Sequence, residues 1–184
     1  MANGCGCLAV GGGQAEARLL EPLVEALRFR GWDAQLCELD EPRRGAPLDA
    51  ARDAYVRLAE RCGGAAVVGL GAGAAVALLL AEQYPAETLT LVAPERGAQR
   101  GARALARLAE RNLFAVVAPT LLVASLGGTS GVRRLLGGLS AREAHVLWTY
   151  GDCPLGVPGE ASRRVIEAIV EHIRHGFDTD SLAN

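Results

Sequence analysis

The sequence contains no lysine, so all 19 of its basic residues are arginine. They are balanced by 21 acidic residues, and the formal net charge is −2. A chain with so little net charge has no electrostatic reason to bind nucleic acid or an anionic membrane as its main partner. We therefore expect neither partner.

Long apolar runs are also missing. No stretch reaches the length of a membrane span, and the apolar residues near Leu8 are too few and too glycine-rich for the core of a signal peptide. Cytoplasmic localisation is the resulting expectation. Cysteines number five, an odd count that argues against a disulfide framework. Cys5 and Cys7 have no second Cys or His pair at a useful spacing, so we predict no metal site and no cofactor.

What the chain does contain is an ordinary globular composition, with 50% hydrophobic and 22% charged residues over 184 positions. We predict one domain over residues 1–176 and a polar, frayed tail over residues 177–184. Short valine- and leucine-rich runs predict strands at 8–10, 33–39, 65–68, 88–93, 119–124 and 144–150. Helical periodicity between them predicts helices at 15–30, 48–61, 74–84, 95–112, 132–139 and 159–175. This alternation predicts an α/β fold with a doubly wound, mainly parallel six-stranded sheet flanked by helices.

The most informative stretch runs from residue 65 to residue 94. A buried strand leads into the sharp turn Gly69-Leu70-Gly71-Ala72-Gly73, and an Ala/Leu helix follows that ends just before Pro85. Strand, glycine-flanked turn and helix form the pattern G-x-S-x-G of a nucleophile elbow, with Gly71 where the serine belongs. Glycine suits that position because it adopts positive φ without a steric cost.

On these residues the chain resembles the α/β-hydrolases, and within them the small carboxylesterase and monoacylglycerol-lipase branch. The resemblance covers residues 8–174. It implies a minimal hydrolase fold that begins at the family's third strand and has one short helix, 95–112, where the family inserts a lid.

The same resemblance places a serine, an acid and a histidine, in that order, at Gly71, Gly128 and Asp152. None of the three residues has the required chemistry, and no carboxylate occurs anywhere in residues 112–141. The three histidines, His145, His172 and His175, fall on a predicted strand and on the closing helix, away from the loops that carry the triad. We therefore expect no serine-hydrolase activity.

The family's oxyanion-binding turns are nevertheless present. The backbone N–H of Ala72 and the loop Gly11-Gly12-Gly13 form a small nest that suits a carboxylate, carbonyl or phosphate oxygen. Tight strand-to-helix turns explain the same glycines equally well. Together with Gly71 at the turn and with Asp152 and Cys153 at the rim, these residues are the candidate binding site for a small acyl or carboxylate ligand.

Several alternatives stay open. Asp152 could activate water in an esterase-like enzyme or a lyase of altered mechanism. The chain could instead be a self-associating module that forms a homodimer. The segment from Gly69 to Ala74 also fits a dinucleotide-binding fingerprint, although it lies in the third strand-to-helix turn rather than the first. Finally, an arginine stripe could attract an anionic ligand or an acidic surface, or simply be a solvated helix face; it consists of Arg96, Arg100, Arg103, Arg107 and Arg111.

Overall fold

A computed structural model describes residues 5–39, 46–94, 111–126, 129–150, 155–156 and 159–181. Six strands form one sheet in the order β2-β1-β3-β4-β5-β6. Every neighbouring pair is parallel. The strands are β1 (Gly6–Gly11), β2 (Asp33–Glu38), β3 (Ala65–Leu70), β4 (Leu89–Val92), β5 (Thr120–Ser125) and β6 (Ala144–Thr149). The predicted α/β class and the predicted sheet are therefore confirmed.

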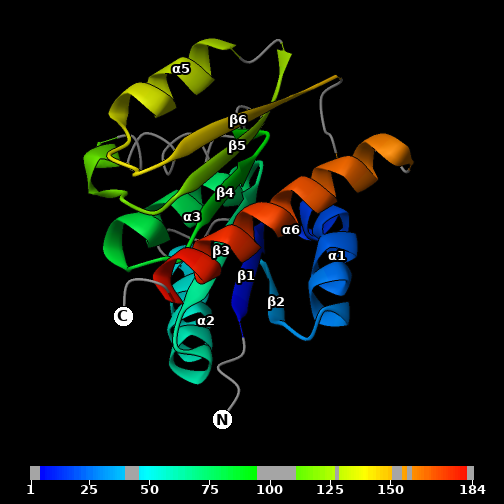
Figure 1. Cartoon of the computed structure of the whole chain (residues 1–184), viewed down its shortest axis with the longest axis vertical. Coiled ribbons are helices and arrows are strands. Elements are labelled where there is room, and N and C mark those ends of the chain that lie inside the picture. Colours follow the sequence, from blue (N-terminus) through cyan, green and yellow to red (C-terminus); the bar gives the residue numbers. More distant parts are fainter. Residues whose placement is uncertain are drawn as a thin grey trace.

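Helices cover both faces of this sheet (Figure 1). On one face lie α1 (Gln14–Phe29) and α6 (Glu160–Ser181), which contact each other. The opposite face carries α2 (Ala46–Cys62), α3 (Ala72–Gln83), the 3-10 helix η2 (Leu113–Ala115) and α5 (Thr129–Gly138). Among the described helices, none combines the length and the apolarity needed to cross a membrane.

Alternation along the strands explains the two layers of core. In β1, Leu8 and Val10 pack toward α2 and α3, whereas Cys7 and Ala9 pack toward α1 and α6. Because successive strand residues point to opposite faces, an all-apolar strand is what a sheet covered on both sides requires. β1 and β3 are buried along their whole length.

The parallel arrangement gives the sheet two distinct ends. We call the end where the strands finish the carboxyl edge and the end where they start the amino edge. After β1 the chain turns to one side to form β2, and after β3 it turns to the other side to form β4. The carboxyl edge between β1 and β3 is thus the point where the winding reverses, which in open α/β sheets is the usual place for a ligand.

One prediction about the chain end is wrong. The closing helix does not stop at His175 but continues as α6 to Ser181. The helix extends further because Phe177, in the predicted tail, packs its ring edge-on against Trp32 with centroids 5.9 Å apart. The predicted helix 95–112 lies for the most part outside the described residues, as do Arg96, Arg100, Arg103 and Arg107 of the arginine stripe. Arg111 is described and exposed.

Candidate functional site

The turn from β3 into α3 has an unusual backbone. Gly71, the residue that caps α3, has φ 57° and ψ −115°. An L-residue with a side chain adopts positive φ only at a cost, whereas glycine does so freely. The conformation is fixed by neighbours, because the Gly71 N–H donates to the carbonyl of Val92 on β4 (3.0 Å) and its carbonyl accepts from the N–H of Ala74 (3.2 Å).

A carboxylate of the chain itself occupies the space beside this turn. Glu16, in the first turn of α1, accepts hydrogen bonds on a single oxygen, Oε2, from two backbone donors. The Gly12 N–H lies 2.8 Å from this oxygen and the Ala72 N–H lies 3.1 Å from it. We call these two donors the nest. Hydrogen bonds to an ionised carboxylate are stronger than neutral ones, and the amino end of α3 adds a favourable dipole.

The second oxygen of Glu16 lies over Gly71. A Cβ atom added to Gly71 would fall 2.6 Å from Glu16 Cδ and would clash with Oε1. A Cβ added to Gly12 would be 2.5 Å from Glu16 Oε2 and would also clash with the Ala72 side chain. Glu16 thus occupies the space that a side chain at residue 71 would need, and at residue 12 the Ala72 side chain blocks a Cβ as well.

Glu16 is the residue that sequence reasoning missed. It stands three residues after Gly13, the residue before α1, and an acid at that position is an ordinary way to stabilise a helix start. Nothing in the local pattern links it to Ala72, which is 56 residues away along the chain. The contact follows from β1 and β3 being neighbours in the sheet, so a correct sheet order was needed to find it.

Comparison with solved structures identifies the fold. A structure of LipS and LipT, two metagenome-derived lipolytic enzymes, aligns with a TM-score of 0.76 at 16% identity, covering 93% of this chain and 94% of that one. The monoacylglycerol lipase of Paleococcus ferrophilus aligns with a TM-score of 0.72 at 16% identity, covering 95% of each chain. The dienelactone hydrolase of Anabaena variabilis aligns at 0.68 and 18% identity, covering 94% and 87%.

The protein has the α/β-hydrolase fold. No family model matches the sequence, and no curated protein matches it either. In serine hydrolases of this fold the oxyanion is held by the N–H of the residue after the nucleophile and by an N–H from the loop after an earlier strand. In this chain the Ala72 N–H lies in the turn after β3 and the Gly12 N–H lies in the turn after β1, and both donate to Glu16 Oε2.

The remaining predicted site residues have more limited roles in the described part of the chain. Gly11 ends β1, and its carbonyl accepts from the N–H of Leu39 at 3.0 Å. Gly13 precedes α1, and its carbonyl accepts from the N–H of Ala17 at 2.9 Å. Gly128, Asp152 and Cys153 lie outside the described residues.

All three histidines of this hydrolase-fold chain lie at the amino edge. His172 packs near Leu89 and Pro119, where β4 and β5 begin, and burial lowers its pKa. His145 pairs in register with Leu121 in the first half of β5. His145 and His175 each place Nε2 within 4 Å of a Glu143 carboxylate oxygen, at 3.7 and 3.8 Å. Because Gly71 lies at the carboxyl edge, it and these imidazoles are at opposite ends of the strands.

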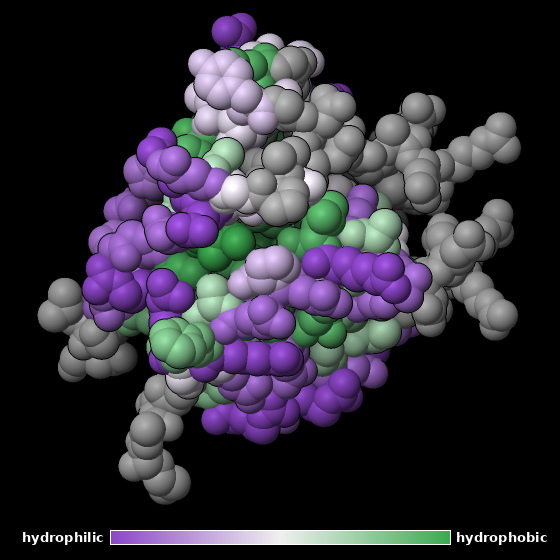
Figure 2. Space-filling view, turned by 90° about the vertical axis from the view of Figure 1, so that its right-hand side faces the viewer, coloured by the Kyte–Doolittle hydropathy of each residue, from purple (hydrophilic) through white to green (hydrophobic). Residues whose placement is uncertain are grey.

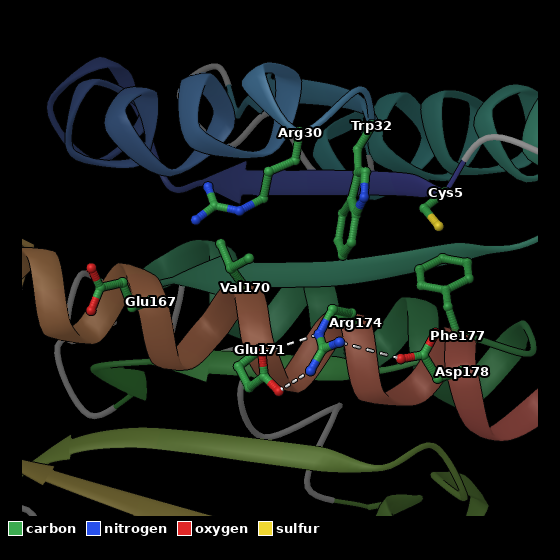
Figure 3. Close-up of a pocket in the computed structure, with 9 residues that line it drawn as sticks. All are labelled: Cys5, Arg30, Trp32, Glu167, Val170, Glu171, Arg174, Phe177 and Asp178. Carbon is green, nitrogen blue, oxygen red and sulfur yellow. Dashed lines mark hydrogen bonds and ion pairs between the residues drawn. The ribbon is translucent and has the colours of Figure 1, made fainter.

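A pocket of about 570 Å³ also lies at the amino edge, between the end of α1 and α6 (Figure 3). Trp32 projects into it, and Arg174 on its floor pairs with Glu171 and Asp178. Cys5 at its rim has its pKa raised, first by burial, so the thiol is protonated at neutral pH. Burial likewise raises the pKa of Cys7 to about 12. This pocket holds no activated nucleophile, and the described residues include no cluster of three side chains able to bind a metal ion.

Proposed function

We propose that this protein is an α/β-hydrolase-fold protein without serine-hydrolase activity. In this proposal it binds a small acyl or carboxylate-bearing ligand, or a protein partner, at the carboxyl edge around the nest. The observation that carries the proposal is the Glu16 carboxylate, which accepts both N–H groups of the nest and crowds Gly71.

The argument against acyl transfer through a serine is both steric and electrostatic. The elbow residue is a glycine, and its missing side chain is replaced in space by Glu16 Oε1. A tetrahedral intermediate needs donors for its oxyanion, but the two donors already hold a carboxylate oxygen that would repel a second negative charge. No histidine lies there to act as the base, since the chain has three histidines and all of them lie at the amino edge.

Support for a binding role at this edge comes from the fold and from the surface. The structural neighbours include lipolytic enzymes and a monoacylglycerol lipase, so acyl chains are a reasonable ligand class to test first. Figure 2 views the molecule from the side on which α6 begins, and hydrophobic residues gather at the centre of this face with hydrophilic residues around them. Apolar surface of this kind suits a ligand with an acyl chain.

The alternative proposal is an ester hydrolase of altered mechanism, in which Asp152 activates water. The esterase and lipase neighbours favour it, because they share the fold over more than 90% of this chain. A third possibility is self-association. Trp148 on the outermost strand β6 and Tyr150 just after it have exposed fractions of 41% and 91%.

An esterase assay separates these proposals. The wild type, Glu16→Gln and Asp152→Asn would be assayed with nitrophenyl acetate and nitrophenyl octanoate, and light scattering would give the oligomeric state. We expect no turnover above buffer for any variant, and a higher melting temperature of the wild type with some member of an acyl and carboxylate series. Wild-type turnover that disappears in Asp152→Asn would replace our proposal with the hydrolase. A dimer that no ligand stabilises would support self-association instead.

A further inference from the structure

We infer that the nest is a carboxylate-binding site with Glu16 as its tethered occupant, and that a free monocarboxylate takes its place once the Glu16 side chain is removed. This inference rests on the proposed binding function and specifies the ligand class and the internal competitor at that site. It assigns to Glu16 the role of a built-in competitor for any ligand.

The two donors of the nest are held by contacts that do not involve Glu16. The turn at Gly71 is fixed through Val92 on the neighbouring strand, and the end of β1 is fixed by the bond between the Leu39 N–H and the Gly11 carbonyl (3.0 Å). Both turns also continue strands that are buried along their whole length. Removing the Glu16 side chain should therefore leave both N–H groups aimed at the same point.

The contacts of Glu16 show which group the nest selects. Its Oε2 accepts from both donors at 2.8 and 3.1 Å. Both donors are backbone N–H groups, so the nest offers hydrogen bonds and no side-chain cation. Two anions cannot share two donors without strong repulsion. A second carboxylate must consequently replace Glu16 rather than bind beside it.

Because the Glu16 side chain is tethered beside the nest, we expect simple carboxylates not to bind to the wild-type protein. A side chain fixed in the same molecule acts as a ligand at an effective concentration of roughly millimolar or higher. Acetate offers no contact beyond its carboxylate and cannot overcome that advantage at moderate concentration. A ligand for the wild-type protein must add apolar contacts, so we expect monocarboxylates with a hydrocarbon chain.

The test compares Glu16→Ala with wild type and with Glu21→Ala, a matched loss of an exposed acid on the same helix. Each protein is titrated with sodium acetate and sodium butyrate, with sodium chloride at equal ionic strength as the control. Melting temperature and the amide resonances of Gly12 and Ala72 are followed. We expect saturable shifts of both amides in Glu16→Ala only, and a rise of about 3–6 °C at ten times the dissociation constant.

Three outcomes would overturn the inference. The first is a response of Glu16→Ala to acetate no larger than its response to chloride. The second is an equal response in Glu21→Ala or in Glu16→Gln, which keeps an oxygen acceptor and should not respond. The third concerns the case in which Glu16→Ala is unfolded: added carboxylate does not restore the circular dichroism of the folded protein. These titrations contain no ester, so wild-type esterase turnover would refute the proposed function and leave their outcome unchanged.

Discussion

The two edges of the sheet use ionisable residues in opposite ways. At the carboxyl edge one carboxylate, from Glu16, is held by backbone donors from two turns that lie far apart in the sequence. At the amino edge there are three histidines, a pocket and several acid–arginine pairs. Within the described part of the chain, the histidines therefore lie at the edge opposite the nest.

The difference lies in what satisfies each charge. Arg174 at the amino edge pairs with Glu171 and Asp178 on the same helix, an arrangement that needs only the helix spacing of three and four residues. Glu16 at the carboxyl edge needs β1 and β3 to be adjacent, α3 to begin at Ala72, and Gly71 to lack a side chain. The contacts of Glu16 therefore depend on the tertiary structure, whereas the pairs of Arg174 depend only on the local geometry of α6.

The largest expected effect comes from restoring the serine at the elbow. Gly71→Ser should destabilise the protein by about 3–5 kcal/mol, because a side chain at positive φ is strained and Glu16 must leave its two donors. Urea denaturation measures this loss. Gly137→Ser on α5 is the matched control, since a Cβ there meets no atom within 4 Å, and it should change stability by less than about 0.5 kcal/mol.

A double-mutant cycle separates the clash between Glu16 and a side chain at residue 71 from the backbone strain at residue 71. The double variant Gly71→Ser/Glu16→Ala should lose about 1–3 kcal/mol less stability than the sum of the two single losses, because the clash exists only when both side chains are present. Additive effects would mean that Glu16 does not occupy the space over Gly71. The carboxyl edge would then be no more specialised than the amino edge.

The sequence sufficed for the fold but only for half of this site. Apolar runs and glycine turns located the six strands, and the turn at Gly71 was recognisable from its flanking glycines. The contact of Glu16 with this turn was not recognisable, because the local sequence indicates only an acidic residue at the start of a helix. Similarly, Phe177 was assigned to the tail. Its contact with Trp32 joins residues 145 positions apart, which the packing of α6 against α1 brings together.

Phe177 offers a test of intermediate size at the amino edge. Phe177→Ala should cost about 1–2 kcal/mol, because the ring is only partly buried but packs edge-on against Trp32. Phe29→Ala, which removes a ring with an exposed fraction of 92%, is the control and should have almost no effect. Equal stability of the two variants would show that α6 is not anchored beyond His175. Urea denaturation followed by tryptophan fluorescence reports both values.

The smallest expected effects concern the pH dependence of the amino edge, where two partly buried groups act in opposite directions. Burial lowers the pKa of His172 below its ordinary 6.5, and burial raises the pKa of Glu82 from 4.5 to about 7. As pH falls below 6.5, the unfolded state binds a proton at His172 that the folded state refuses, so this residue destabilises the fold. Between pH 7 and 4.5 the folded state binds a proton at Glu82 that the unfolded state releases, so this residue stabilises the fold on acidification.

Single substitutions separate the two contributions. Relative to wild type, His172→Gln should gain stability as pH falls from 7.5 to 5, and Glu82→Gln should lose it over the same range. Urea denaturation at several pH values gives these differences, in which the other titrating groups largely cancel. A pH-independent difference for His172→Gln would mean that its imidazole is hydrated in the folded state. The amino edge would then be open to water and to ligands, and the contrast between the two edges would have to be drawn from the nest alone.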